Sequence, residues 1–345
     1  MIKLKLLPHS NGVYKVNMRN KLKPKEIIRN ISLYIIIIIS IGFIYQKISN
    51  FIARETLKQR VDYARVDDKR LDYIVDGTGK HTVVFDGNIG TNLNQWNQIR
   101  DELTSEYDDI TTFTYNRRGY GYSDGGSART PKEQAEDLRI LLRKSAVPAP
   151  YILVGEEYGS LVLTEFAKAY PELVSGIVLV NPLVEDNINT SEFIKRLKVD
   201  KFRRKIESIG SSIGFTSLLD KFNLSCKIGE FEDGLDKNSL EEFKVHRTKS
   251  NYTKAVYNEL ENITGGENNS QEEGVFSGKP YYLISKDGQE GLKLLGDNEL
   301  TKVYNIKSNN DIVSMSNPET VVTGIRQIVK QVNEIERLNK KLGKK

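Results

Sequence analysis

Residues 151–160 read YILVGEEYGS, and this stretch decides the fold. The apolar run Tyr151–Val154 predicts a buried strand, and the spacing of apolar residues over 158–170 predicts a helix directly after it. Gly155 and Gly159 flank the turn between the two elements, which lets the backbone bend sharply and pack closely. A buried strand that passes directly into a helix is typical of a parallel sheet.

The alternation of strands and helices continues on both sides of this stretch. Further strands are predicted at Leu71–Val75, Thr82–Phe85, Ile110–Tyr115, Gly176–Val180, Tyr281–Ile284 and Lys302–Ile306. Helices are predicted at 94–105, at 130–144 with Thr130 as N-cap, and from Pro318 onward. The first two strands are expected to pair as a hairpin around residues 76–79. The pattern predicts an α/β protein with a doubly wound, mostly parallel sheet.

The alternation breaks after Pro182 and resumes near residue 276. Residues 183–275 are rich in helix formers and charge, which indicates a helical lid inserted into the α/β domain. We therefore predict a first core segment at 71–182, the lid at 183–275 and a second core segment at 276–345.

Composition excludes several classes of protein. The chain has 345 residues, 38% of them hydrophobic, which suffices for a buried core and argues against intrinsic disorder. Cys226 is the single cysteine, so no intramolecular disulfide and no cysteine-based zinc site can form. Residues 71–345 carry an excess of acidic side chains, which argues against a nucleic acid as partner.

Residues 30–46, NISLYIIIIISIGFIYQ, lack charge between Arg29 and Lys47. As a helix this run would rise about 25 Å, close to the thickness of a bilayer core. It is apolar on every face, unlike most core helices of soluble proteins, and no small-x-small cleavage site precedes Ala53. The sequence predicts an uncleaved transmembrane signal-anchor, with the lipid bilayer as the partner of residues 30–46.

Charge on the two sides of this run predicts its orientation. Residues 1–29 contain eight Lys and Arg against Glu26, whereas residues 47–70 mix seven Lys and Arg with four Asp and Glu. The positive-inside rule then makes 1–29 a basic cytoplasmic tail. Residues 47–70 are expected to form a helical stalk, and the main domain is expected outside the cell membrane, on a single-pass anchor.

Five spaced segments resemble the α/β-hydrolase fold family over about residues 71–339. They are FDGNIGTNLNQW (85–96), YNRRGYGYSD (115–124), ILVGEEYGS (152–160), YPELVSGIVLVNP (170–182) and NPETVVTGI (317–325). The five segments follow one another in the same order as in the family. The resemblance is specific because all five are present. The resemblance implies the α/β-hydrolase fold, with a lid over the carboxyl edge of the sheet, where such folds bind ligands.

The resemblance also implies which positions correspond to the family's triad. The family presents a serine in a G-x-S-x-G elbow, and here Glu157 stands at that position. The histidine position, counted back from Pro318, is Asp311, and the three histidines of the chain are His9, His81 and His246. The acid position falls on Asp287, with Glu185 or Asp186 as the alternative.

Candidate ligand-binding residues follow from the same correspondence. Asp86 and Gly87 stand where the family usually has His-Gly, and Glu156 stands where it often has histidine. The backbone N–H groups of Asn88 and Tyr158 occupy the family's oxyanion-hole positions. The carboxylate of Glu157 is expected to fold onto such donors and fill the hole from within.

Three interpretations of these residues compete. A serine hydrolase needs a hydroxyl activated by a base, and in this chain both residues are replaced. The favoured interpretation is a non-catalytic domain that binds a small molecule, lipid or protein without a cofactor. The alternative is a divergent hydrolase for ester, epoxide or halide-type substrates, with Glu157 as nucleophile and Asp311 as base; dehalogenase-like and epoxide-hydrolase-like relatives attack with aspartate. A third hypothesis is a cation site formed by Asp86, Glu156, Glu157 and Asp311.

Two features of the lid complete the sequence-based expectations. The segment KRLKVDKFRRK (195–205) contains seven Lys and Arg and one acid; it indicates either a solvated helix face or a contact with anionic lipid headgroups. His246, in EEFKVHRTKS, is expected to be an exposed helical residue that can act only if the lid folds it over Glu157.

Overall fold

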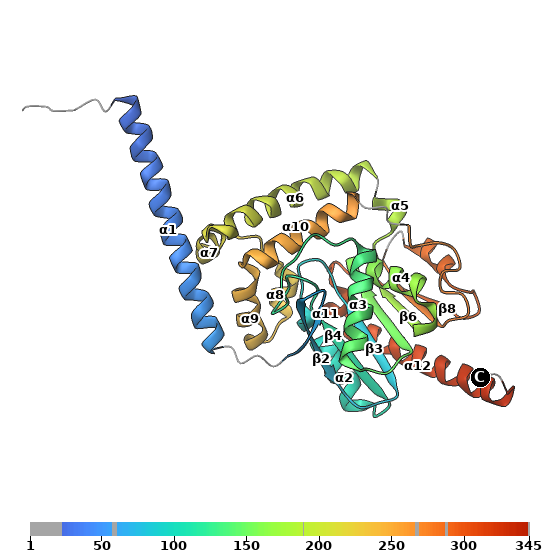
Figure 1. Ribbon diagram of the computed structural model, residues 1–345. Helices are drawn as coiled ribbons and strands as arrows, with labels where there is room; N and C mark the ends of the chain where they lie inside the picture. The colour runs from blue at the N-terminus through green and yellow to red at the C-terminus, as the bar shows by residue number, and fades with distance from the viewer. Residues whose placement is uncertain (1–22, 57–60, 189, 266–268, 287–288, 344–345) are drawn as a thin grey trace, which may run out of the picture.

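The computed structural model describes residues 23–56, 61–188, 190–265, 269–286 and 289–343. At its centre lies an eight-stranded sheet with strand order β1-β2-β4-β3-β5-β6-β7-β8 (Figure 1). The strands are β1 (Asp62–Val66), β2 (Lys69–Asp76), β3 (His81–Asp86), β4 (Ile110–Tyr115), β5 (Tyr151–Glu156), β6 (Val174–Val180), β7 (Tyr281–Ser285) and β8 (Thr301–Asn305). From β4 to β8 all neighbours are parallel, which confirms the predicted doubly wound, mostly parallel sheet.

The pairing of the first strands differs from the prediction. β2 pairs antiparallel with β1 on one side and with β4 on the other, whereas β3 lies between β4 and β5. The expected hairpin of β2 with β3 is therefore wrong. The sequence suggested a hairpin because a Gly-rich turn joins the two strands. In the structure β3 is buried along its whole length, as a central parallel strand must be.

Helices cover both faces of the sheet. One face carries η1 (Leu93–Trp96), α2 (Asn97–Glu106) and α12 (Pro318–Lys341), and the other carries α3 (Pro131–Ser145) and α4 (Tyr158–Ala169). Thr130 caps α3 as predicted, through a capping box with Glu133. The shorter helices of the core are η2 (Pro171–Leu173), η3 (Glu290–Leu295) and α11 (Val313–Ser316).

Between β6 and β7, the described part of the chain forms six helices. They are α5 (Glu185–Ile188), α6 (Ser191–Ser212), α7 (Phe215–Lys221), α8 (Gly229–Gly234), α9 (Lys237–Arg247) and α10 (Ser250–Gly265). Phe231, Phe243 and Tyr252 of these helices pack with Tyr120, which follows β4, and with Ile312, which follows β8. The inserted helices therefore cover the edge of the sheet where the parallel strands end (Figure 1).

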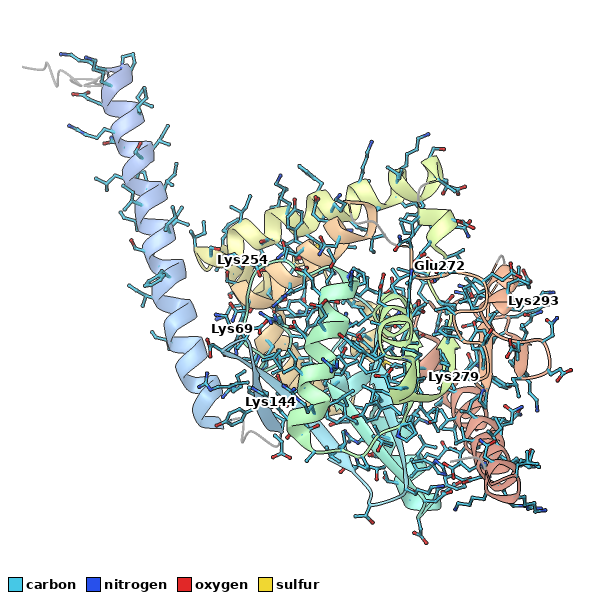
Figure 2. The ribbon with its side chains drawn as sticks, turned by 45° about the vertical axis from the view of Figure 1, so that its right-hand side comes forward. Lys69, Lys144, Lys254, Glu272, Lys279 and Lys293 are labelled. Atoms are coloured by element: carbon cyan, nitrogen blue, oxygen red, sulfur yellow. The ribbon has the colours of Figure 1, made fainter. Side chains whose placement is uncertain are left out.

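Helix α1 (Pro24–Thr56) stands apart from the α/β domain at its N-terminal end, and Figure 2 shows its side chains there projecting into open space. Its segment Pro24–Ile44 is long and apolar enough to cross a membrane, and apart from Gly42 it is not buried in the protein. The expected helical stalk over 47–70 is only partly right. Residues 47–56 continue α1, but Asp62–Val66 form β1, whose pairing with β2 overrides the local helical pattern.

Candidate functional site

Glu157 lies at the tip of a sharp turn between β5 and α4. Its backbone has φ +48° and ψ −113°, a conformation that a non-glycine residue adopts only when its surroundings enforce it. Gly159 is required because a Cβ atom there would lie 2.3 Å from the carbonyl oxygen of Asp86. The strained backbone of an elbow is therefore present, with a carboxylate at its tip.

The Glu157 side chain turns back onto backbone donors. Its Oε2 accepts a hydrogen bond from the N–H of Ile89 at 2.9 Å. Burial raises the pKa of Glu157, and the N–H groups of Ile89 and Tyr158 together with the Arg117 guanidinium act against that rise. The carboxylate thus occupies donors in the region expected to form an oxyanion hole.

Asn88, expected to supply an oxyanion-hole donor, is engaged elsewhere. Its N–H donates to Oε1 of Gln95 at 3.1 Å, and its side-chain Oδ1 accepts from Nε2 of Gln95 at 2.9 Å. Nε2 of Gln95 also lies 2.7 Å from Oε2 of Glu156 and 3.0 Å from Oγ of Ser314. Gln95 therefore links the loop after β3, the elbow and helix α11.

Glu156 is fully buried and faces away from Glu157's donors. Its Oε1 accepts hydrogen bonds from the N–H groups of Val313 and Ser314 at the start of α11. Burial raises the pKa of Glu156 to about 7, although these hydrogen bonds oppose the rise. Glu156 therefore fastens the elbow to the segment that follows β8.

Asp86 belongs to a buried ion network rather than to an open pocket. Nη1 of Arg117 pairs with Oδ1 of Asp86, and Nε of Arg117 lies 2.7 Å from Oε1 of Glu259 on α10. The hydroxyl of Tyr115 donates to the second oxygen of Asp86 at 2.6 Å, and Arg117 also donates to the carbonyl of Gly87 at 2.9 Å. Arg117 thus balances one carboxylate of the sheet and one of the lid.

Of the positions equivalent to the triad histidine and acid, the structure describes Asp311 and the alternatives Glu185 and Asp186. The Asp311 side chain is 88% exposed and pairs with Lys286 at 3.3 Å, and among the described residues no hydrogen bond joins it to Glu157. Its backbone N–H donates to Glu230 of the lid at 2.7 Å. Asp287 lies outside the described residues, while the N–H of Glu185 donates to Gln271 and the Glu185 carboxylate accepts from Ser270.

The two histidines that the structure describes contact residues other than Glu157. His246, expected to be exposed, is only 3% exposed, because its ring packs edge-on against Tyr122 with the ring centroids 4.4 Å apart. Its Nδ1 lies 3.2 Å from Nζ of Lys249, and burial lowers its pKa to about 3. His81 begins β3 at the opposite edge of the sheet and contacts Asn333 at 3.0 Å, and His9 is outside the described residues.

The proposed four-carboxylate cation site does not assemble. Asp86 is paired with Arg117, Glu156 faces α11, Glu157 faces Ile89 and Asp311 faces solvent. Among the residues that the structure describes, no group of three or more His, Cys, Asp or Glu side chains is placed to hold a metal ion.

Sequence reasoning missed Gln95 and Glu259, two buried polar residues of this region. Gln95 lies in the turn Leu93–Trp96, where Asn94 is polar as well, so the local pattern does not single it out. Glu259 carries no local signal, since its partner Arg117 is 142 residues away in the chain. Only the docking of α10 onto the loop after β4 brings the two together.

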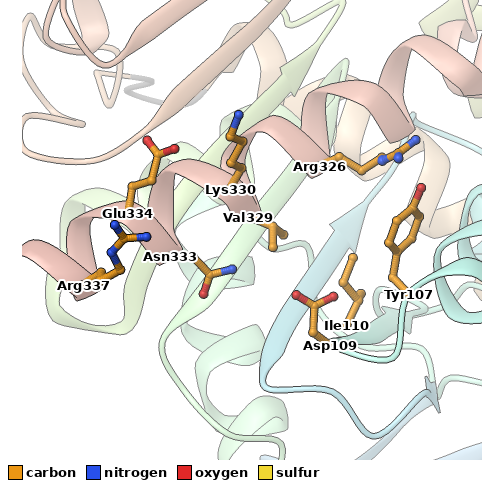
Figure 3. Close-up of a pocket in the computed structure, with 9 residues that line it drawn as sticks. All are labelled: Tyr107, Asp109, Ile110, Arg326, Val329, Lys330, Asn333, Glu334 and Arg337. Carbon is orange, nitrogen blue, oxygen red and sulfur yellow. The ribbon is translucent and has the colours of Figure 1, made fainter.

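Glu157 lines none of three cavities found among the described residues. A cavity of about 370 Å³ lies between α12 and the start of β4, at the edge opposite the elbow (Figure 3). Arg326 lies over the ring of Tyr107 at one end of it. A cavity of about 700 Å³ separates α2 from α9, and a small one of about 40 Å³ lies between the loop after β4 and α10.

The comparison with a family profile matches the central part of the chain. Residues 81–210 match the family described as alpha/beta hydrolase fold. Among curated proteins, YqjL of Bacillus subtilis, an uncharacterized protein, is 30% identical over 125 residues, covering 33% of this chain and 48% of YqjL. Pyrrolizixenacetamide deacetylase of Xenorhabdus hominickii is 32% identical over 117 residues, covering 34% of this chain and 42% of that enzyme. The chain thus spans about half the length of these relatives.

Solved structures are similar over most of the chain. A Pseudomonas aeruginosa protein described as an epoxide hydrolase has a TM-score of 0.63 at 15% identity, covering 81% of this chain and 98% of that one. A thermophilic esterase of Thermogutta terrifontis has a TM-score of 0.59 at 17% identity, covering 79% and 99%. At these identities the likeness concerns the fold.

Proposed function

Since this chain has the α/β-hydrolase fold, we propose that it is a membrane-anchored hydrolase-like protein whose elbow is filled by its own Glu157, and that its α/β domain binds a ligand or partner without catalysis. The observation that carries the proposal is the hydrogen bond from the N–H of Ile89 to the Glu157 carboxylate. A site that stabilises a substrate oxyanion needs such donors free, and here an anion of the protein itself engages one of them.

The chemistry of the elbow supports the same proposal. A hydrolase of the serine type needs a hydroxyl at the tip and a base within hydrogen-bond reach of it. Glu157 offers no hydroxyl, and His246 of the inserted helix α9 is buried against Tyr122. Asp311, at the histidine-equivalent position, is solvated and paired with Lys286.

Restoring the missing groups tests the proposal. We expect the full-length protein, purified in detergent, to show no turnover of p-nitrophenyl esters above that of Glu157→Gln. Asp311 is near enough to raise the pKa of Glu157 electrostatically, so an imidazole at position 311 would stand near a hydroxyl at position 157. The double variant Glu157→Ser with Asp311→His should therefore gain at least about tenfold in esterase rate. Glu157→Ser alone is the matched control, since it provides the hydroxyl without the base.

Ester turnover by the unmodified protein that disappears in Glu157→Gln would refute the non-catalytic proposal. Thermal unfolding of each variant shows whether the fold survives. For the binding role, stabilisation by a screened lipid or small acid should be weakened by lid substitutions, since a ligand that binds only the folded state raises its melting temperature. A flat response across both classes of ligand would count against that role.

A second candidate, a divergent hydrolase with Glu157 as nucleophile, is favoured by the strained elbow, which holds the carboxylate at the position of attack. In this reaction a Glu157 carboxylate oxygen bonds to an epoxide carbon as the ring carbon–oxygen bond breaks, and the alkoxide takes a proton from water. A second water molecule gives a proton to Asp311 and adds to the carboxyl carbon of the ester, which releases the diol and leaves one water oxygen in Glu157. Turnover of an epoxide in ¹⁸O-labelled water would place the label in the Glu157 carboxylate. Mass spectrometry of the peptide that contains Glu157 distinguishes this candidate from the first.

We further propose that α1 spans the cell membrane and holds the α/β domain on the outer side. The support is the exposed apolar segment Pro24–Ile44 and the excess of cations before it. Residues 30–46 are then in contact with lipid, which accounts for their exposed isoleucines.

A further inference from the structure

Helix α6 of the lid buries polar residues and exposes apolar ones, which is the reverse of an ordinary surface helix. On the side packed against the protein, Glu207, Ser208 and Ser211 are buried, and Ser211 Oγ lies 2.7 Å from Oγ1 of Thr253 on α10. Its exposed apolar residues are Val199, Phe202, Ile206 and Ile209, joined by Ile213 directly after the helix; all five are 37–65% exposed. Helices of soluble proteins bury the apolar face, so this exposed face requires an explanation.

The exposed apolar residues of α6 form one stripe. At 3.6 residues per turn, these five side chains fall within an arc of about 80°. Lys198 and Lys205 flank the stripe on one side, and Arg196 and Arg203 flank it on the other. An apolar stripe bordered on both sides by cations is the pattern of helices that lie in a membrane interface, with the charged groups reaching the headgroups.

The apolar surface continues into the next helix. Phe215, Leu218, Phe222 and Leu224, on α7 and just after it, are 36–68% exposed. We call the outer residues of α6 and α7 together the lid stripe. Four cations border it, and it extends over two helices, so it is more than a scattering of single exposed side chains.

The lid stripe begins where α1 meets the lid. A Cβ atom on Gly42 would lie 2.8 Å from the carbonyl oxygen of Ile213, and one on Gly214 would lie 2.2 Å from the carbonyl oxygen of Gly42. The backbones of α1 and of the turn between α6 and α7 are therefore in contact. Gly42 is close to the C-terminal end of the segment Pro24–Ile44, where α1 would leave the bilayer.

The direction of α6 fits a membrane surface. Figure 1 shows α6 running crosswise to α1 along the outermost side of the domain, away from the sheet. A helix crosswise to a transmembrane helix, and level with its end, lies in the plane of the interface. The outer side of α6 then faces the same lipid that surrounds α1.

We propose that the lid stripe is a second membrane contact, in which α6 and α7 lie in the outer interface of the anionic bilayer that α1 spans. The inference rests on the proposed anchoring by α1. The apolar stripe enters the boundary between headgroups and acyl chains, and the flanking Lys and Arg pair with lipid phosphates. The inserted helices that cover the carboxyl edge of the sheet are thereby held at the lipid surface.

The depth of labelled side chains tests this placement in the full-length protein. In a Cys226→Ser background, single cysteines replace Ile206 in the lid stripe, Ile36 in α1 and Lys293, which lies on the side of the domain away from α1 (Figure 2). Each carries an environment-sensitive fluorophore, and the protein is reconstituted in phosphatidylcholine vesicles with about one quarter phosphatidylglycerol and a spin-labelled phospholipid. Phe202→Cys provides a second, independent position on the stripe.

We expect lipid quenching at Ile206 and Phe202 at least about twofold stronger than at Lys293, and weaker quenching by aqueous iodide. Quenching at Ile36 without quenching at either stripe position overturns the lid contact while the anchor stands. Absence of quenching at Ile36 overturns the anchor, and the lid contact with it. The stripe positions could instead be protected from iodide in a way that depends on the protein-to-lipid ratio, without lipid quenching. That result would assign the stripe to a contact with a second copy of the chain and overturn the proposal.

The flanking cations give a second readout. Replacing phosphatidylglycerol by phosphatidylcholine should reduce quenching at Ile206 at least about twofold and leave Ile36 unchanged, because only the interfacial contact depends on headgroup charge. Inorganic phosphate added to neutral vesicles should not restore it, which separates a lipid headgroup from a free anion. Equal quenching in both lipids would contradict the role given to Lys198, Lys205, Arg196 and Arg203.

Discussion

Glu156 and Glu157 are neighbours in the chain, yet the turn sends their carboxylates to different partners. Glu157 reaches the N–H of Ile89, whereas Glu156 reaches the start of α11. The two carboxylates point to different partners because Glu156 is still part of strand β5, whereas Glu157 has the positive φ of the elbow. One carboxylate is structural, and the other occupies the place where a nucleophile would stand.

The elbow glycine gives the first prediction. In Gly159→Ala, the new methyl group would collide with the backbone of Asp86 and Gly87, which cannot move aside as a flexible side chain could. We expect a loss of about 2–3 kcal/mol in the free energy of unfolding, measured by urea titration. Gly291→Ala is the matched control, because no atom lies within 4 Å of its Cβ position. Equal stability of the two variants would show that the elbow is not packed as described.

Glu156 gives a prediction about pH. Burial raises its pKa to about 7 from an ordinary value of 4.5, so between these values the folded state keeps a proton that the unfolded state has released. The free energy of unfolding therefore falls as pH rises through this window, by on the order of 3 kcal/mol for this group. We expect Glu156→Gln to flatten this part of the pH profile.

Other acids whose pKa values are raised mainly by burial set the background of that measurement, among them Glu157, Asp137 and Glu165. The pKa of Asp72 is raised to about 6 and that of Glu242 to about 7, in both cases mainly by burial. They act in the same direction, so part of the decline should remain in Glu156→Gln. An unchanged profile between pH 4.5 and about 7 would mean that Glu156 does not titrate in this range.

At the scale of elements, Arg117 connects the sheet to the lid. It stands between Asp86 at the end of β3 and Glu259 on α10, and all three side chains are less than 10% exposed. Arg117→Met would leave two buried carboxylates without a counter-ion. We expect a loss of about 3–5 kcal/mol in the free energy of unfolding, with faster amide hydrogen exchange in α10.

The exposed pair of Lys286 with Asp311 serves as the control for Arg117. Its Asp311 side chain is 88% exposed, and surface pairs of this kind contribute less than about 1 kcal/mol. Lys286→Met should therefore change stability little. If Arg117→Met were equally mild, the lid would be held by its apolar contacts alone, such as those of Phe243 and Tyr252 with Tyr120.

At the scale of the whole molecule, the proposed orientation predicts which positions a membrane-impermeant reagent can reach. In the Cys226→Ser background, a cysteine at Lys293 should react with an impermeant maleimide in intact cells, because the domain is proposed to lie outside. A cysteine at Lys5 should react only after the cells are opened. The reverse pattern would place the domain in the cytoplasm and contradict the interpretation of the basic tail.

The sheet could be predicted because its signals are local. Strands such as Ile110–Tyr115 are continuous apolar or β-branched runs, and Thr130 with Glu133 marks a helix start within four residues. The pairing of β2 could not be predicted, because whether a strand joins its neighbour in sequence or a later strand depends on the packing of the whole sheet. His246 was placed wrongly for a similar reason: its burial depends on Tyr122, which comes from another segment of the chain.

The amino-acid sequence by itself determined that this chain alternates strands and helices and that an apolar segment precedes them. It also determined that Glu157 stands at the elbow and that the equivalent triad position holds no histidine. Each of these is a property of residue identity and spacing. Only the tertiary structure decided where the charges are balanced. Arg117 and Glu259, or Gln95 and Glu156, meet through long-range packing that no local pattern encodes. The same holds for the lid stripe, since a helical pattern shows that one face is apolar, and only the neighbours of α6 decide that this face is the exposed one.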